Sequence, residues 1–205
     1  MIEARELACR RGGRLIFSDL AFRLKPGDAL LLVGANGTGK TSLLRLLAGF
    51  ARPAAGVIRW DGEDIAEDLA GHRTRVHFLG FADGLKGLLT AEENLAFLAA
   101  LLGPGAEPLA RALEGFGLAA RAHRPARTLS AGQRRRLALA RLAAAPRPLW
   151  LLDEPGVALD REGRARLEEA IERHRARGGI AVIATHGDVS VRDPLVLELG
   201  DRSAC

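Results

Sequence analysis

A glycine-rich loop between a predicted strand and a predicted helix constrains this chain more than any other feature. The apolar run at 29–33 precedes the loop, and a helical pattern at 40–47 follows it and stops at Gly49. Glycines let backbone amides turn inward, and a helix N-terminus adds about half a positive charge. The loop is therefore predicted to cradle phosphate oxygens. Its residues are Gly34, Ala35, Asn36, Gly37, Thr38, Gly39, Lys40 and Thr41, with Ser42 directly after them.

The Lys-Thr pair gives this loop its specificity. We expect Lys40 to reach the β- and γ-phosphates of ATP as a mobile point charge, and the Thr41 hydroxyl to take one position around Mg²⁺. The alternative is a glycine turn that binds nothing, which the Lys-Thr pair and the strand-loop-helix context disfavour.

Two adjacent carboxylates follow a second buried strand, predicted at 149–152. On an extended strand Asp153 and Glu154 would point in different directions, because side chains alternate. We expect Asp153 to hold Mg²⁺ through water, and Glu154 to polarise the water that attacks the γ-phosphate. If the phosphate loop were missing, the better interpretation would be that Asp153 and Glu154 belong to a strand end that only caps the next helix.

His186 follows a third buried strand, predicted at 180–184. A ring nitrogen there can hydrogen-bond the γ-phosphate and orient the Glu154 water. A histidine at a strand end is more often structural when it stands alone, but its position relative to the loop and the acidic pair favours a role in catalysis.

The order of the elements predicts an α/β fold in which these three sites converge. Continuous apolar strands separated by helices indicate a parallel sheet covered on both faces, and ligands bind at the carboxyl ends of such strands. The predicted strands lie at 2–8, 21–24, 29–33, 57–60, 149–152 and 180–184, and the predicted helices at 40–47, 90–102, 107–114, 130–142 and 161–175.

Residues 84–128 interrupt this alternation and are expected to form a small helical lobe. Thr90 and Glu93 have the spacing of a capping box at the start of its first helix, and Gly103-Pro104-Gly105 breaks that helix. We expect one domain over residues 1–205, with 1–83 and 129–205 forming the nucleotide-binding core.

Composition excludes several other classes of protein. No run reaches the roughly 18 apolar residues that cross a bilayer, and the N-terminus is charged, so we expect a cytoplasmic chain. Cys9 and Cys205 lie too far apart in sequence for a metal or redox pair. The net charge of +5 could indicate nucleic acid or anionic lipid, but arginine is spread along the chain and aromatic residues make up only 4%. No nucleic-acid partner is expected.

A short motif between the loop and the acidic strand identifies the family. It comprises Leu129, Ser130, Ala131, Gly132 and Gln133, with Ser130 and Gln133 at capping-box spacing. Together with Asp160, after the acidic strand, it resembles the signature of the ABC ATPases. The resemblance covers essentially the whole chain and implies a RecA-like P-loop NTPase core, an antiparallel β edge and a small helical subdomain.

The resemblance also implies a shared nucleotide site. Two such domains pack head to tail, so that Ser130 and Gly132 contact the nucleotide held by the other copy, and Gln133 and Asp160 belong to the same site. The N-terminus of the helix that Ser130 opens can clamp the γ-phosphate only when the dimer closes. ATP would close the dimer and hydrolysis would release it.

Two positions depart from the family pattern. Arg11 stands where most members stack an aromatic side chain on adenine, although a guanidinium plane can replace it. Phe81 stands where a glutamine normally contacts magnesium and water. With these departures, its short length and the alanine at the middle of the signature, the chain resembles the CcmA family, the ATP-binding subunits of cytochrome c maturation.

That resemblance implies a peripheral protein on the cytoplasmic face of the bacterial inner membrane, paired with an integral membrane subunit of the CcmB type and serving haem export or delivery. No haem-ligation motif surrounds the remaining histidines, which are His72, His77, His123 and His174. Three alternatives stay open: a soluble ABC ATPase acting on nucleic acid or ribosomes, which usually needs a coiled-coil insertion or tandem units; an exporter ATPase for another cargo; and a small-molecule kinase, which leaves Ser130 unexplained.

Overall fold

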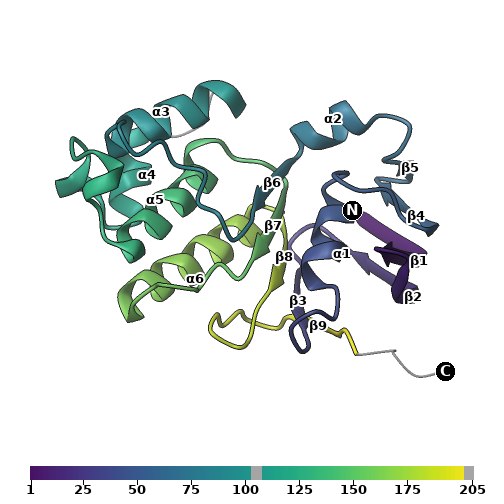
Figure 1. Cartoon of the computed structure of the whole chain (residues 1–205). Coiled ribbons are helices and arrows are strands. Elements are labelled where there is room, and N and C mark those ends of the chain that lie inside the picture. Colours follow the sequence, from purple (N-terminus) through teal and green to yellow (C-terminus); the bar gives the residue numbers. More distant parts are fainter. Residues whose placement is uncertain (103–107, 201–205) are drawn as a thin grey trace.

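A five-stranded parallel sheet forms the centre of the protein (Figure 1). This computed structural model describes residues 1–102 and 108–200. The strand order is β6-β7-β8-β3-β9, and every neighbouring pair is parallel. The predicted parallel sheet is confirmed. Its strands are β3 (Ala29–Val33), β6 (Val76–Leu79), β7 (Leu149–Asp153), β8 (Ile180–Ala184) and β9 (Leu195–Glu198).

Both faces of this sheet are buried at its centre, because β3 and β8 are apolar at every position and β7 is apolar up to Asp153. In β7, Leu149 and Leu151 pack into one hydrophobic cluster, whereas Trp150 and Leu152 pack into the other. The residues of β8 divide in the same way. Alternating side chains therefore give the sheet two separate cores, one on each face.

A second, antiparallel sheet covers one side of this centre (Figure 1). Its buried Ile2 and Leu7 share a hydrophobic cluster with Leu43 and Leu47 of the helix that follows the glycine loop. This is the antiparallel β edge that the family resemblance implies. The order is β2-β1-β4-β5, with β1 (Ile2–Arg11), β2 (Arg14–Leu24), β4 (Ala55–Trp60) and β5 (Glu63–Asp64).

Helices complete the layers on both sides of the parallel sheet. On the side of the antiparallel sheet lies α1 (Lys40–Leu47), with α2 (Leu69–Thr74) beyond it (Figure 1). Helices α5 (Ala131–Ala144) and α6 (Arg161–Ala176) cover the opposite face. Helices α3 and α4 lie farther from the sheet and contact α5. These elements are α3 (Ala91–Leu102), α4 (Leu109–Gly115), η1 (Ala119–Arg121), η2 (Ala126–Thr128), α5 (Ala131–Ala144) and α6 (Arg161–Ala176).

The helices at 84–128 share their core with the sheet. Leu95 of α3 and Leu113 of α4 belong to the same cluster of buried residues as Leu152 of β7. The capping box at the start of α3 is confirmed, because the Glu93 amide donates to Thr90 Oγ1 across 3.1 Å and the Thr90 amide donates to Glu93 Oε2 across 2.7 Å. The division of the chain into core and helical subdomain stays a prediction.

Several boundaries differ from those predicted. Strands β1 and β2 are longer, because they stay paired up to the turn at Gly12 and Gly13, where Arg11 lies opposite Arg14. Elements α2, β5, β6, β9, η1 and η2 were not predicted. The predicted break at Gly103-Pro104-Gly105, the start of a helix at 107 and Cys205 lie outside the described residues. Within residues 1–102 and 108–200 no helix is both long and apolar enough to cross a bilayer.

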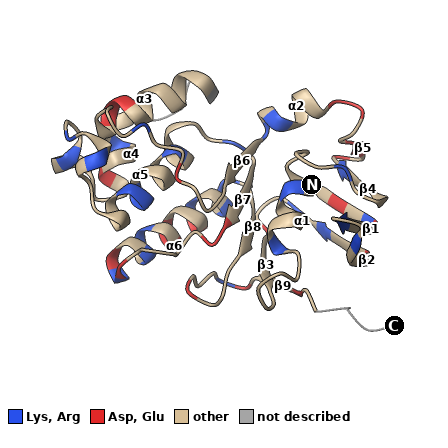
Figure 2. Ribbon diagram, viewed as in Figure 1, with Lys and Arg blue, Asp and Glu red and all other residues tan. Residues whose placement is uncertain are grey.

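Positive charge is spread over the whole molecule. Figure 2 shows Lys and Arg on the helices of the lobe, on α6 and on the antiparallel sheet, with Asp and Glu between them. The basic residues are thus spread over the fold as they are along the sequence.

Candidate active site

The carboxyl ends of β3, β7 and β8 lie at the same edge of the parallel sheet, as predicted. A cavity of about 400 Å³ opens there. The glycine loop forms one wall, and Asp153 and Glu154 from the end of β7 form another. The lining residues are Arg11, Ile16, Asn36, Gly37, Gly39, Lys40, Thr41, Ser42, Phe81, Asp153 and Glu154.

Two positions in the loop have room only for glycine. Gly34 has a φ of +142°, and a Cβ atom there would lie 2.4 Å from the carbonyl oxygen of Leu199. Gly39, the N-cap of α1, has a φ of +105°, and its Cβ atom would lie 2.6 Å from Ile16. Both glycines therefore permit a turn that no larger residue could follow, and this turn presents the start of α1 to the cavity.

Lys40 is folded back into the loop. Its side chain is only 6% exposed, and Nζ donates to the carbonyl oxygens of Gly34 at 2.7 Å and Ala35 at 3.2 Å. A nearly buried ammonium that is held by two neutral acceptors keeps its full positive charge available to an anion in the cavity.

Thr41 and Asp153 meet at the floor of the cavity. The Thr41 hydroxyl donates to Asp153 Oδ2 across 2.8 Å, and Asp153 is 7% exposed. A hydroxyl and a carboxylate oxygen at one point are the ligand types that Mg²⁺ prefers. The geometry therefore fits the predicted magnesium position.

Glu154 is not extended, and the premise that it continues the strand was wrong. Its φ is +48°, in the left-handed region, and its amide donates to the carbonyl oxygen of Ala184 across 2.9 Å. The turn that β7 makes at its end, rather than strand alternation, separates Glu154 from Asp153. Such a backbone costs a residue with a side chain about 1 kcal/mol or more, and strain of this kind clusters at functional sites.

The environment of Glu154 favours proton acceptance. Partial burial raises the pKa of its carboxyl above the ordinary value, an effect that His186 and Lys40 oppose and that Asp188 and Asp153 reinforce. A raised pKa makes an ionised carboxylate a stronger base, which suits a group that takes a proton from water.

His186 joins the end of β8 to both other segments. Its Nε2 lies 3.2 Å from Glu154 Oε1 and 2.9 Å from Asn36 Oδ1 in the glycine loop. The ring nitrogen thus lies between the candidate base and the candidate phosphate loop. Three segments that are distant in sequence are brought together by one side chain.

The signature residues lie outside this cavity. Ser130 and Gln133 cap α5 reciprocally, with the Gln133 amide donating to Ser130 Oγ across 3.2 Å and the Ser130 amide donating to Gln133 Oε1 across 3.0 Å. Asp160 caps α6 by accepting from the Gly163 amide across 2.8 Å. Gly132 must be small, because a Cβ atom there would lie 2.9 Å from the Ala158 carbonyl oxygen. Among the described residues that line the cavity, none comes from the signature.

Among the other residues in and near the cavity, sequence reasoning identified some and missed others. Arg11 and Phe81, the two departures from the family pattern, both line it. Ile16, which also lines it, was missed because a partly buried apolar residue in a hairpin carries no chemical signal. Arg135, whose buried guanidinium contacts the backbone of Glu154, was missed because sequence alone does not reveal which of three consecutive arginines is buried.

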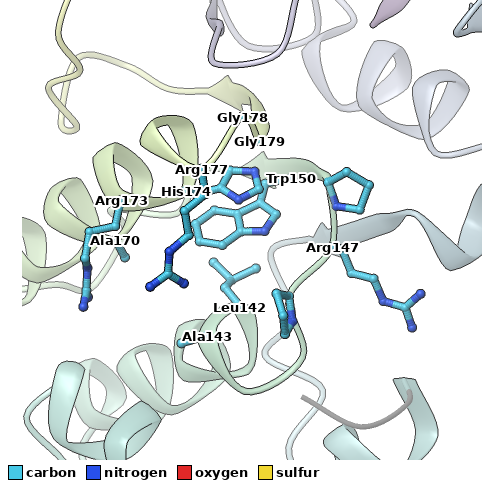
Figure 3. A pocket seen from close by; sticks show the side chains of 12 residues that line it. Leu142, Ala143, Arg147, Trp150, Ala170, Arg173, His174, Arg177, Gly178 and Gly179 are labelled. Atoms are coloured by element: carbon cyan, nitrogen blue, oxygen red, sulfur yellow. The ribbon is translucent and has the colours of Figure 1, made fainter. Parts of the chain in front are cut away.

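A second cavity, of about 250 Å³, lies at the opposite edge of the sheet (Figure 3). Trp150 forms its floor, and the ring of His174 stacks on the indole at 3.9 Å between centroids. Burial lowers the pKa of His174 to about 4, so this ring is neutral at pH 7. The cavity contains none of the predicted site residues.

The family to which this chain is similar agrees with the residues found at this site. Residues 17–157, which include the loop, the signature and the acidic pair, match the family described as ABC transporter. The chain belongs to the ABC transporter family. As a member of this family, it binds and hydrolyses ATP.

Within the ABC transporter family, the chain belongs to the CcmA group. The cytochrome c biogenesis ATP-binding export protein CcmA of Rhodospirillum rubrum is 54% identical over 194 residues, which cover 95% of this chain and 83% of that protein. The protein of the same name from Paramagnetospirillum magneticum is 51% identical over 92% of this chain and 88% of its own length. A putative ABC transporter ATP-binding protein from Pyrococcus furiosus has the same fold, with a TM-score of 0.84 at 22% identity, covering 97% of this chain and 96% of that one.

Proposed function

We propose that this chain is the ATP-hydrolysing subunit of a cytochrome c biogenesis complex, in which it works as a head-to-tail dimer on an integral membrane subunit of the CcmB type. The observation that carries the proposal is the meeting of Lys40, the Thr41–Asp153 pair and Glu154 at one cavity, with His186 in contact with Glu154. The alanine-containing signature and the similarity to CcmA proteins support the cytochrome c assignment.

In this proposal the glycine loop binds the triphosphate. The backbone amides of residues 34–39, the positive end of α1 and the Lys40 ammonium all carry charge of the sign that phosphate requires. Lys40 would exchange its two carbonyl acceptors for β- and γ-phosphate oxygens, which are charged and bind it more strongly. Arg11, which lines the cavity, would cover the adenine.

Thr41 and Asp153 would hold Mg²⁺ beside the triphosphate. When bound, this ion supplies positive charge that neutralises the β- and γ-phosphate oxygens during phosphoryl transfer. Asp153 is nearly buried, and its short contact with Thr41 leaves the other carboxylate oxygen for water in the coordination sphere.

Glu154 would take the proton of the attacking water, and His186 would orient that water and the γ-phosphate. The Glu154 carboxylate is positioned by its left-handed backbone and by its contact with His186 Nε2 at 3.2 Å. A positioned general base of this kind contributes about 10²- to 10⁴-fold to a rate.

The signature of a second copy would complete the site. Ser130 and Gly132 lie at the start of α5, outside the cavity of their own chain, where the helix N-terminus provides an anion-binding surface. Gln133 and Asp160 would support this surface from the same side. ATP would then bridge two copies, and loss of the γ-phosphate would separate them.

The membrane partner would give this ATPase its biological role. We place the chain as a peripheral protein on the cytoplasmic face of the bacterial inner membrane, where it would serve haem export or delivery. The four histidines outside the active site do not gather into a haem site. His72 and His77 are buried and bonded to backbone carbonyls, His174 stacks on Trp150, and His123 pairs with Glu92.

Co-purification tests the proposed complex. The tagged chain, expressed in a bacterium that makes c-type cytochromes, should be extracted from membranes with an integral subunit of the CcmB type, and Glu154→Gln should abolish c-type cytochrome formation without breaking that association. Recovery with an unrelated transporter subunit, or normal cytochromes in the variant, would contradict the assignment.

A further inference from the structure

Arg135 of α5 is a buried arginine that joins two segments of the active site. It is 4% exposed, and its guanidinium donates five hydrogen bonds. Two go to the segment after β6 and three to the end of β7. The acceptors are Gly80 O at 3.0 Å, Asp83 Oδ1 at 3.3 Å, Asp153 O at 3.1 Å, Glu154 O at 2.8 Å and Pro155 O at 3.3 Å.

Stability alone gives little reason for an arginine at this position. Burying a guanidinium is costly, and well-packed apolar residues often replace a buried ion pair without loss of stability. Here one carboxylate, Asp83, balances the charge, and its side chain is itself 26% exposed. The other four acceptors are neutral carbonyl groups, so the guanidinium contributes mainly the fixed geometry of its fork.

One arm of this fork fixes the backbone of the candidate base. Arg135 Nη2 donates to the Glu154 carbonyl, while the Glu154 amide donates to Ala184 O across 2.9 Å. The residue is thus held on both sides in its left-handed conformation, with φ at +48°. Its carboxylate then lies 3.2 Å from His186 Nε2.

The other arm fixes the segment that carries Phe81. Gly80 and Asp83, the two acceptors, flank Phe81, which is 80% exposed and lines the cavity. The neighbouring Arg134 differs from Arg135, because its guanidinium donates locally to Leu129 O across 2.9 Å. The bonds of Arg135 therefore place residues 80–83 and 153–155 in one connected unit.

We propose that Arg135 is a positioning residue for ATP hydrolysis: it holds the backbone of Glu154 and links it to residues 80–83, so that a displacement of this segment moves the catalytic carboxylate. The inference rests on the proposed function, because it requires Glu154 to be the base. A contact that displaces residues 80–83 would thereby change turnover without touching the nucleotide.

Amide hydrogen exchange and kinetics of the full chain test this link. In Arg135→Gln we expect exchange to become about tenfold faster or more in both 80–83 and 153–156, because each segment loses bonds to the same guanidinium. The kcat for ATP should fall by about tenfold or more, while its KM changes by less than about threefold, since the phosphate loop is untouched. Arg164→Gln, on the exposed side of α6, is the matched control and should change neither quantity.

Each outcome decides one claim. Unchanged exchange in either segment, or an unchanged kcat, would overturn the role of Arg135, and so would a rise in KM with kcat preserved. If Arg135→Gln does not fold, Arg135→Lys serves instead, because lysine keeps the charge but cannot reproduce the fork and should show the same changes. A wild-type chain without ATPase activity would overturn the proposed function, whereas the exchange pattern would still decide whether Arg135 links the two segments.

Discussion

Thr41 and Asp153 are joined by a hydrogen bond of 2.8 Å although 112 residues separate them in the sequence. The first ends the glycine loop and the second ends β7, so the parallel sheet is what brings them together. This contact defines the position at which we expect Mg²⁺ to bind.

Removing the Thr41 hydroxyl should weaken magnesium dependence specifically. In Thr41→Ala we expect the Mg²⁺ concentration for half-maximal ATPase activity to rise about tenfold, which corresponds to about 1.4 kcal/mol and one lost ligand contact. Thr41→Ser keeps the hydroxyl and should stay within about twofold of wild type. A magnesium titration at saturating ATP measures both, and equal titration curves for Thr41→Ala and Thr41→Ser would remove Thr41 from the metal position.

The carboxylate of Glu154 should be needed for turnover and not for binding. Glu154→Gln retains the shape of the side chain but cannot accept a proton, so we expect kcat to fall by about 10²-fold or more with ATP affinity unchanged within about threefold. Equilibrium binding of a fluorescent ATP analogue, measured beside phosphate release, separates the two. Undiminished hydrolysis would exclude Glu154 as the base.

Phe81 should limit the basal rate. The family resemblance implies a glutamine amide at this position, and Phe81 lines the cavity. We expect Phe81→Gln to restore a polar contact to magnesium and water and to raise basal kcat by roughly threefold to tenfold, equivalent to about one hydrogen bond. Phe81→Leu, which remains apolar, is the control. Identical kinetics for wild type, Phe81→Gln and Phe81→Leu would show that the position is silent in basal turnover.

Two histidines with strongly lowered pKa values should make the protein less stable as the pH falls below 6.5. Burial lowers the pKa of His77 to about 3 and that of His174 to about 4. Between these values and 6.5 the unfolded chain binds protons that the folded chain does not, so the free energy of unfolding decreases as the pH is lowered. The limiting slope is about 1.4 kcal/mol per pH unit for each histidine, and it extends to lower pH for His77, whose pKa in the folded protein is the lower of the two.

Urea unfolding at pH 7.5 and pH 5 checks this sign. The loss of stability between the two pH values should be smaller in His77→Phe than in wild type by about 2 kcal/mol. His123→Gln is the control, because the His123 side chain is 91% exposed. An equal loss in all three proteins would show that His77 does not titrate differently on folding.

Much of the site could be predicted because its chemistry is local in sequence. The glycine loop, the acidic pair and the capping boxes are short patterns with fixed spacing, and the boundaries of β3, α1 and β8 follow directly from apolar runs and glycines. Their convergence followed from the rule that ligands bind at the carboxyl ends of parallel strands.

The remainder depends on tertiary contacts that leave no local pattern. The left-handed turn at Glu154 is imposed by the bonds that its amide and carbonyl make to Ala184 and Arg135. Arg135 itself lies in a run of three arginines, and only the packing of α5 against the end of β7 decides which one is buried. Strand β9 has only three consecutive apolar residues, which is a shorter run than the five that marked β3 and β8.

The dimer formed on ATP tests the shared site most directly. Glu154→Gln with ATP and Mg²⁺ should sediment as a dimer that contains two ATP molecules, because binding proceeds and release does not. Adding Ser130→Arg to this variant should leave a monomer that still binds one ATP, because the bulky cation blocks the start of α5 from the nucleotide of the other copy. A stable ATP-bound dimer of the double variant, or a Glu154→Gln chain that stays monomeric with saturating ATP and Mg²⁺, would contradict a site completed by Ser130 of a second copy.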